Sequence, residues 1–505
     1  MSQEIEHLSK KPLLIIRAFI ICLLSFIFPF AIPSFAQEPV ADEVLTLIKE
    51  YVQSENKERT ERVFQRFELS FYDAKTPHLP VDPTAPPIAR AVQYLRNTQV
   101  TPMEEFLIGR DFAGNWPQYL YLTGYPFIRI RDVSPFMPTF IHHALSIITD
   151  ENIDTLGLTL AEAIDAQTMR QNAIDLMLRF KARESDPDAG TFGYWPYQRE
   201  SFNCVDWWLA LWLQSVLQGP LFMGSRAPFN VSFFSPDLAF PTDADDTATI
   251  YAALLDHSLL DGGPVIDVNI ERFFSDWRDL GQVPRRINPE WLPHASGVFL
   301  TWLAYRDPPD NSLPNDVDLV VNASILYVLA RYDLLDTPGV QESISLINTA
   351  TKNKFYATQP EEVSDYYPYN YSYHYYISRA YHEGPVPALK PAVEILADEL
   401  EQTAQPNLNG TIFWDRGDPH LNTALAILTL LNAGRTSPLI DSAVEYLLAE
   451  QDPMYGNWKE GIFYVGRVDA GYVVNAVSPA LTTAIVLEAL CRHKLNSVHA
   501  AKISP

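Results

Sequence analysis

The chain has 505 residues, of which 47% are hydrophobic and 12% aromatic, a composition sufficient for one large domain or two ordinary ones. Its formal net charge of -25 excludes the basic surface that nucleic-acid binding requires and argues against electrostatic attachment to anionic lipid. Only three cysteines occur, and the CxxC, HExxH, GxGxxG and P-loop patterns are absent, so we expect no disulfide framework, no metal and no cofactor.

The first 36 residues have the pattern of a secretory signal peptide. Lys10, Lys11 and Arg17 precede an apolar run over residues 18–32, and the small residues up to Ala36 suit a cleavage site. The run is shorter than the about 20 apolar residues that span a bilayer. We predict a signal peptide over residues 1–36, with an uncleaved membrane anchor as the alternative, and hence an exported protein, periplasmic or membrane-associated.

Residues 37–87 read as a helix near 42–61 followed by a proline-rich linker. From 88 to 496 the pattern is uniform, with apolar-periodic helical segments separated by Pro, Gly, Asn and Asp turns, and a tail follows at 497–505. Strand-like alternation is nearly absent, and segment 367–373, which imitates it, contains the proline and polar residues of a loop. Examples of the helices we expect are those at 159–183, 205–217, 246–260, 297–305, 318–335, 388–402, 421–431, 439–450 and 481–491.

A weak repeat places glycine a few residues before tryptophan at 111–116, 189–195, 409–414 and 455–458. Glycine lets the chain reverse after a helix, and the indole ring can fill the gap between stacked helix pairs. A recurring helix–loop–helix unit cannot bury its own apolar face, so the units must stack or close into a ring. The sequence therefore predicts an all-α fold, an (α/α)6 toroid of inner and outer helices formed by a single domain over 88–496.

Three carboxylates, Asp243, Asp245 and Asp246, lie within four residues where a helix should begin. Asp is a favoured N-cap, and acids in the first turn complement the free N–H groups, so a capping role is one interpretation. The other is a carboxyl group kept protonated by burial and by its like-charged neighbours, and used as an acid. We expect capping from Asp246 and also from Asp243, alongside an acid role for Asp245.

Residues 243–248 (DADDTA) match the DxDDTA motif and resemble the class II terpene cyclase family, which includes the squalene–hopene cyclases. Segment 451–458 is similar to the QW repeat of that family. Segment 318–322 resembles the stretch that supplies a partner to the catalytic acid, and 461–466 with Tyr472 resembles the closing aromatic stretch. The chain is short for a two-domain member and is similar to the single-domain type, as in the cyanobacterial merosterolic acid synthases.

The resemblance implies proton-initiated cyclisation of a linear polyprenyl substrate, which is either a prenylated aromatic acid or squalene-like. Asp245 is then the proton donor, flanked by Asp243 and Asp246, with Asp318 and Asn322 in the partner segment. The partner position holds Asn322 where squalene-type enzymes usually have His, so an amide is expected to hydrogen-bond the acid. The implied partners are a hydrophobic isoprenoid substrate and a membrane surface, without nucleic acid. The expected substrate-binding aromatic residues are Phe234, Trp207, Trp302, Tyr366, Phe463, Tyr464 and Tyr472.

Two other functions remain open. An (α/α)6 toroid can host a secreted carbohydrate-active enzyme, for which Asp206 beside Trp207 and Asp276 beside Trp277 would be the carboxylates and platforms. A non-catalytic hydrophobe-binding protein on the same scaffold would use the Asp cluster purely as a helix cap. The adjacent pair at 142–143 (His-His) points apart on a helix, so we expect no metal site there.

Overall fold

The computed structural model describes residues 79–102, 112–124, 130–182, 189–194, 242–262, 269–303, 315–468 and 472–503. All of them belong to one of the two units into which the chain divides, the one formed by Phe71–Trp207 and Gly224–Pro505. The expected helices at 42–61 and 205–217, the signal peptide and the linker up to residue 78 lie outside the described residues. In the part of the chain that is described, no helix is both long and apolar enough to cross a membrane.

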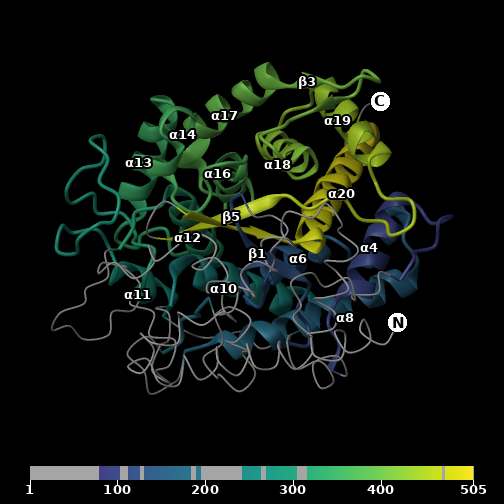
Figure 1. Cartoon of the computed structure of the whole chain (residues 1–505), viewed down its shortest axis with the longest axis horizontal. Helices are drawn as coiled ribbons and strands as arrows, with labels where there is room; N and C mark the ends of the chain where they lie inside the picture. Colours follow the sequence, from purple (N-terminus) through teal and green to yellow (C-terminus); the bar gives the residue numbers. More distant parts are fainter. Residues whose placement is uncertain are drawn as a thin grey trace, which may run out of the picture. The chain divides into compact units, whose positions relative to one another are not determined.

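Six helices form a closed inner ring in which each packs against the next and the last returns to the first (Figure 1). Their residues are buried on nearly all sides, as expected for helices that are apolar around their whole circumference. In α12, for example, every residue from Leu319 to Leu329 is buried. In ring order the six are α6 (Phe136–Ser146), α10 (Ala244–Asp261), α12 (Leu319–Arg331), α16 (Ser372–His382), α18 (Pro419–Asn432) and α20 (Pro479–Ile503).

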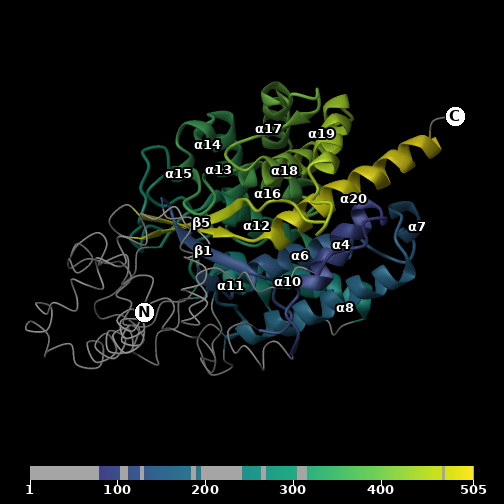
Figure 2. The same cartoon turned by 45° about the vertical axis from the view of Figure 1, so that its right-hand side comes forward.

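Six further helices alternate with these along the chain, and each packs against the outside of at least one inner helix (Figure 2). The clearest amphipathic case is α13, which buries Val340, Ile344 and Ile347 on one face and exposes polar residues on the other. This alternation confirms the predicted all-α fold and its (α/α)6 arrangement. The outer helices are α4 (Pro87–Thr98), α8 (Leu160–Met177), α11 (Ile270–Ser275), α13 (Val340–Lys352), α17 (Lys390–Thr403) and α19 (Pro438–Ala449).

Short elements connect these layers. They are α7 (Ile153–Leu156), α14 (Phe355–Thr358), α15 (Pro360–Val363), the 3-10 turns η2 (Leu178–Phe180) and η4 (Pro387–Leu389), and the two-stranded ribbon of β3 (Gln405–Pro406) and β4 (Ile412–Phe413).

The inner helices run parallel, so their amino ends meet at one end of the ring and their carboxyl ends at the other. At the amino end, Asp418 before α18 accepts from the backbone of Ile462, and Asn370 before α16 donates to the Ile462 carbonyl. At the carboxyl end, Arg331 of α12 pairs with Asp256 of α10 at 2.6 Å. The partial positive charges of the helix amino ends therefore gather on one side and the negative ends on the other.

A four-stranded antiparallel sheet at the amino end of the ring was not expected from the sequence. Its order is β2 (Ile130–Asp132), β1 (Gln118–Leu122), β6 (Tyr472–Val477) and β5 (Ile462–Val468). The pairing of β5 with β6 shifts between Ile462 and Tyr464, so Phe463 is the extra residue of a bulge. Because a bulge re-aims side chains, Phe463 and Tyr464 are adjacent in sequence yet both buried, and both contact Phe136.

The glycine–tryptophan repeat has the structural role that the sequence suggests. In each described case the indole Nε1–H donates to a carbonyl in the last turn of the preceding outer helix. Each ring therefore fills a gap and ties its loop to the end of the outer helix before it. The three pairs are Trp116 with Leu95 of α4, Trp414 with Leu400 of α17, and Trp458 with Leu447 of α19.

The loop before Trp458 contacts α4, the first described helix, and so joins the last part of the chain to the first. Gln451 donates to the carbonyl of Pro87 at the start of α4, at 2.9 Å. Gly456 has a positive φ of 77°, and a Cβ built there would lie 2.6 Å from the carbonyl oxygen of Arg90. The position therefore requires glycine both for its backbone conformation and for the close approach of α4.

Two element boundaries differ from expectation. The predicted helix at 297–305 is absent: in its described part, Phe299 and Trp302 form isolated bridges with Arg278 and Asp243, and Gly297 has φ 78°. This extended segment is held by backbone hydrogen bonds to both sides, which override its helical periodicity. The last helix, α20, continues to Ile503, into the segment expected as a tail from 497.

Candidate active site

The three clustered carboxylates lie at the start of α10 and are all buried. Asp243 is the N-cap, and its Oδ1 accepts from the backbone N–H of Asp246 at 2.6 Å. Burial raises the pKa of Asp243 to about 6 and of Asp245 to about 7, and it raises the pKa of Asp246 well above its usual range. The capping role expected for Asp246 is wrong, because neither of its carboxyl oxygens meets a backbone donor.

The surroundings of Asp245 raise its pKa from the usual range to about 7, so a large share of the carboxyl group is protonated near neutral pH. Burial is the largest influence on its pKa; Tyr367 and Ser324 lower that pKa by hydrogen bonding, whereas Asp243 raises it. Oδ2 accepts a hydrogen bond from the phenol of Tyr367, and the buried Oδ1 has no hydrogen-bond partner of good geometry. None of these influences is a positive charge, so no ion pair holds Asp245 in its ionised form.

Asn322 does not make the contact with the acid that we expected. Its Nδ2 donates to the carbonyls of Phe299 at 3.0 Å and Asp318 at 2.8 Å, and its Oδ1 accepts from Phe299 N–H and from the Ser343 hydroxyl. The amide thus uses its hydrogen-bonding capacity to hold the loop, α12 and α13 together. The donor to Asp245 is instead the phenol of Tyr367.

Asp318 caps the neighbouring inner helix and lies close enough to raise the pKa of Asp245. Its Oδ1 accepts from the backbone of Val320 and Val321, and its Oδ2 accepts from the Ser364 hydroxyl at 2.7 Å. Burial nevertheless raises the pKa of Asp318 to about 6. Its bond to Ser364 anchors the turn that carries Tyr367, so Asp318 positions the partner of the acid.

A group of aromatic side chains from α6, β5 and two turns packs together around Tyr367, the residue that contacts the acid. Phe463 is fully buried, with its ring 6.0 Å from Phe136 and 6.3 Å from Tyr367. Tyr464 is 5.3 Å from Phe136 and shares a 2.6 Å hydroxyl contact with Tyr194. The structure therefore brings Phe463 and Tyr464 to the amino end of α10, whereas Phe136, Tyr194 and the acid-binding role of Tyr367 had not been recognised in the sequence.

Two other expected aromatic residues, Trp302 and Tyr366, form an adjoining group. Their rings meet edge to face at 6.2 Å, and Trp302 pairs through its backbone with Asp243. The Tyr366 hydroxyl donates to Asp316 at 2.8 Å, and Arg286 lies beside both. The backbone bridge between Trp302 and Asp243 thus places this group beside the carboxylate cluster. Its other edge is polar, because Arg286 and Asp316 form an ion pair there.

The remaining expected residues are not placed at the site. Phe234, Trp207 and Asp206 lie outside the described residues, and of Tyr472 only the backbone is described, in strand β6. The carboxylate of Asp276 is exposed and pairs with Arg272 at 3.1 Å on the outer surface of α11. Asp276 therefore offers no buried acid for the carbohydrate-active alternative.

A signal for one missed residue was present in the sequence. Ser134-Pro135 before Phe136 has the form of a helix start, and the α6 helix does begin at Phe136. The contact between Tyr194 and Tyr464 joins residues 270 apart in the chain, and no local pattern encodes it.

In chemical terms, the fold and this geometry define a helical ring with a buried, protonatable carboxyl group at the amino end of an inner helix. The helix dipole stabilises the carboxylate that remains after proton donation, while burial keeps the proton on the acid beforehand. Such a group can protonate a substrate in a place with little water, and ring faces can stabilise a cation formed beside it.

Searches with the sequence found no matching family model and no matching curated protein. Among solved structures, the chain resembles the type II terpene cyclase MstE from Scytonema in its apo form, with 12% identity, a TM-score of 0.44, and coverage of 81% of this chain and 97% of that chain. A variant of MstE in complex with merosterolic acid A (product) matches at 14% identity, TM-score 0.44, covering 81% and 96%. A variant in complex with geranylgeranyl dihydroxybenzoate (substrate) matches at 13% identity, TM-score 0.40, with the same coverage. The resemblance is one of fold at a distance.

Proposed function

We propose that this chain is a class II terpene cyclase. Asp245 protonates the last double bond of a linear isoprenoid, and the isoprenoid then cyclises. The observation that carries the proposal is the state of Asp245: a buried carboxyl group with a pKa of about 7, bonded to a phenol and flanked by other acids. An ordinary Asp, with a pKa of about 3.9, would be ionised and could not act as the acid.

The proposed reaction balances without a cofactor. The proton of Asp245 forms a C–H bond with one alkene carbon, and the cation left on the other carbon is attacked by the next double bond. Each ring closure forms one C–C bond from one π bond and moves the cation along the chain. Loss of a proton from carbon, or capture by a hydroxyl group within the substrate, ends the sequence, so the product is an isomer of the substrate.

The rings of Phe463, Tyr464 and Tyr367 support this role for the site. The ring centroids of Phe463 and Tyr464 lie 6.3 and 6.4 Å from that of Tyr367, and aromatic faces attract cations by about 0.5 to 2 kcal/mol each. They also replace water, which would otherwise capture the cation. The sequence contains no DDxxD motif for diphosphate and magnesium, which favours a substrate without diphosphate.

The experiment is incubation of the full chain with geranylgeranyl dihydroxybenzoate and with squalene in D₂O. A cyclase of this kind gives a product isomeric with the substrate that carries one deuterium from solvent on the carbon that was protonated. Asp245→Asn should abolish product while leaving the melting temperature near that of wild type, because the amide is isosteric with the carboxyl group. Asp276→Asn, an exposed position of the same residue type, is the control and should retain full turnover.

Retained cyclisation in Asp245→Asn would refute the assignment of the acid. Tight binding of both probes without any product, and with Asp245→Asn behaving like wild type, would favour the hydrophobe-binding alternative. Hydrolysis of a glycan library by wild type would favour the carbohydrate-active alternative, although Asp276 gives that function no support.

We also propose that the protein works outside the cytoplasm, because the charged start, apolar run and small residues up to Ala36 form a signal-peptide pattern. Mass spectrometry of the protein recovered from fractionated cells tests this. A mature chain beginning at Gln37 in the exported fraction is expected, and an intact, cytoplasmic chain would contradict it.

A further inference from the structure

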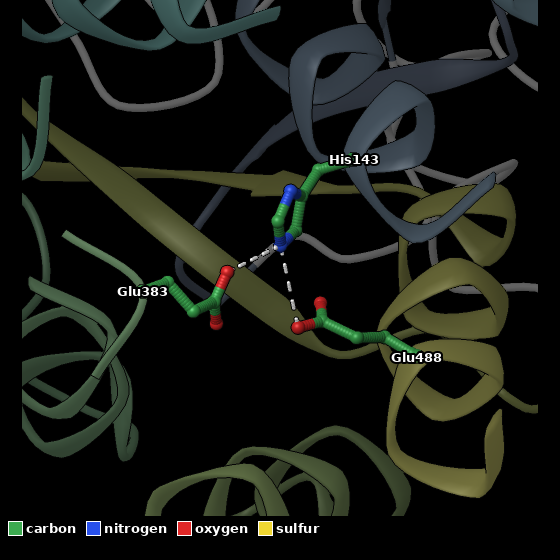
Figure 3. Close-up of side chains that lie close together, drawn as sticks. All are labelled: His143, Glu383 and Glu488. Atoms are coloured by element: carbon green, nitrogen blue, oxygen red, sulfur yellow. Dashed lines mark ion pairs between the residues drawn. The ribbon is translucent and has the colours of Figure 1, made fainter. Parts of the chain in front are cut away.

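A second group of buried ionisable side chains lies at the carboxyl end of the inner ring, away from Asp245. We call it the carboxyl-end cluster, and Figure 3 shows its centre, where His143 of α6 faces Glu383 and Glu488. Glu383 follows α16, and Glu488 belongs to α20. Five of the six inner helices contribute to the cluster. Its members are His143, Asp256 of α10, Arg331 of α12, Arg379 and Glu383 at α16, and Glu488 and Arg492 of α20.

His143 is the one member that faces partners on both sides. Its Nε2 is 3.1 Å from Glu383 Oε2, 3.5 Å from Glu488 Oε1 and 3.2 Å from Arg492 Nη2. Its Nδ1 is 3.7 Å from Asp256 Oδ2. A protonated ring carries an N–H on both sides, so it can donate toward Glu383 or Glu488 with Nε2 and face Asp256 with Nδ1 at the same time. A neutral ring carries only one N–H and no charge, so it can donate on one side only.

The spacing of His143, Glu383 and Glu488 would suit three ligands of a metal ion. The position between the two carboxylates is already held by a cation, however. Arg492 Nη2 is 2.9 Å from Glu383 and Nε is 2.9 Å from Glu488, so a metal would have to displace a guanidinium. Within the described residues the cluster is thus complete as an ion-pair network.

The charge of the cluster depends on His143. Three arginines balance Asp256, Glu383 and Glu488, so a neutral His143 leaves the network neutral and a protonated one gives it a single positive charge. The six inner helices end here, and each carboxyl end carries about half a negative charge, which favours the protonated ring. A positively charged cluster is therefore stabilised by the negative helix ends among which it lies.

The other titratable groups near His143 either pair with one another or contact the edge of the cluster. Arg170 of α8 pairs with Asp261 of α10 at 2.6 Å, and His257 lies 3.2 Å from the same Asp261. Tyr375 donates to Glu488 at 3.1 Å, and the guanidinium of Arg379 lies over the ring of Tyr327. No lysine from these described helices enters the cluster.

We propose that the carboxyl-end cluster is a pH-dependent lock, in which protonated His143 ties α6 to α10, α16 and α20 and holds the ring closed. Deprotonation of His143 removes its positive charge, and with it the attraction to Asp256, Glu383 and Glu488, and it leaves an N–H on only one side of the ring. The inner helices are then joined at this end by the ion pairs of Arg331 and Arg492. The lock is independent of the proposed cyclase activity, because it lies at the opposite end of the inner helices from Asp245.

The electrostatic balance supports this direction. Burial and Arg379 favour the neutral imidazole, but Glu488, Glu383 and Tyr327 outweigh them and raise the pKa of His143 well above its usual range. A group whose pKa is raised on folding contributes stability that is complete below its unfolded pKa of about 6.5 and is lost as pH rises through the folded pKa. The lock should therefore weaken on the alkaline side of neutrality.

The cluster should also weaken in acid. Burial alone would raise the pKa of Glu383, but Arg492 and His143 hold it well below its usual range. For Asp256, the hydrogen bonds with His143 and Arg331 likewise outweigh burial and lower the pKa. These carboxylates contribute stability above their unfolded pKa values and lose it as pH falls through the folded ones, so stability should peak between the two limits.

The test is the melting temperature of the full chain from pH 5 to 10, for wild type, His143→Gln and His142→Gln. His142 is the matched control: it is the neighbouring residue on α6, is also buried, and burial lowers its pKa to about 3, so it stays neutral throughout. We expect wild type to lose about 3 °C or more between pH 7 and 10, and His143→Gln to start lower and to lack this step. His142→Gln should keep the step whatever its absolute stability.

Should His143→Gln fail to fold, NMR titration of the Cε1–H resonances of His142 and His143 in wild type tests the lock without a variant. A resonance titrating above pH 7 that is assigned to His143 supports the proposal, and a His143 that is neutral at pH 7 overturns it. Equal pH profiles for wild type and His143→Gln would also overturn it. The same would follow if Zn²⁺ raised the melting temperature and EDTA lowered it in wild type but not in His143→Gln, because this result would identify a metal site instead.

Discussion

Tyr367→Phe is the sharpest perturbation of the candidate acid, because it removes a single hydroxyl group and keeps the ring. In wild type this hydroxyl donates to Oδ2 of Asp245 and lowers the pKa of the carboxyl group, which burial has raised to about 7. A hydrogen bond to a charged group contributes about 1.5 to 3 kcal/mol, and a pKa change of one is equivalent to about 1.4 kcal/mol. Loss of the phenol should therefore raise the pKa of Asp245 by about 1 to 2.

The assay is the pH dependence of kcat/KM for cyclisation. Activity needs the protonated acid, so the rate falls as pH rises through the pKa of the Asp cluster. In Tyr367→Phe this alkaline limb should move upward by about 1 to 2 pH units. The rate on the acid plateau should fall about tenfold or more, because the carboxylate left after proton transfer has lost a donor.

Tyr373→Phe is the matched control. Tyr373 is a buried tyrosine in the first turn of α16, a few residues after Tyr367, but its hydroxyl contacts Thr351 of the outer helix α13 at 2.8 Å. Its variant should leave the alkaline limb unchanged. An alkaline limb that stays in place or moves downward in Tyr367→Phe would refute the reasoning, since either result would mean that the phenol does not stabilise the ionised acid.

Two further predictions concern the scaffold. Gly456→Ala should lower the free energy of unfolding by about 3 kcal/mol, because its Cβ meets the backbone of Arg90 in addition to the strain of a positive φ. Gly434→Ala, which has φ 71° and open space around it, should cost only about 1 kcal/mol, and urea unfolding of the pair separates the two effects. Asn322→Ala should cost about 2 to 4 kcal/mol, because it leaves buried backbone groups without partners. Its alkaline limb should nevertheless stay where it is in wild type, and a shift would restore Asn322 as a partner of Asp245.

The ring itself could be predicted from the sequence because its signals are local and recur. Serine followed by proline marks the starts of α19 and α20, and the glycine–tryptophan repeat marks the ends of α4, α17 and α19. Helices that are apolar on all sides must be buried, and amphipathic helices must cover them, so an alternation of the two kinds favours an inner and an outer layer. These features do not depend on contacts between distant segments.

The candidate site was predicted only in part because its contacts are long-range. Asp243 and Asp245 are identified by a local motif, whereas the bond from Tyr367 to Asp245 spans 122 residues. The bulge at Phe463 was missed because two adjacent aromatic residues on one side break the alternation that identifies a strand. Asn322 was assigned to the acid by its position in a motif, but its amide faces Phe299 and Ser343.

The junction between α4 and the loop before α20 has a consequence for how the protein is made. Gln451 bonds to Pro87, and α20 packs against both α4 and α6, so the contacts that close the ring join segments more than 300 residues apart. Such contacts carry a large loop-closure cost and form late. A nascent chain can stack its early helix pairs as they emerge, but it must wait for its last helix to complete the circle. Phe463 and Tyr464 arrive only with that final segment, so the aromatic surroundings of Asp245 are completed late in folding.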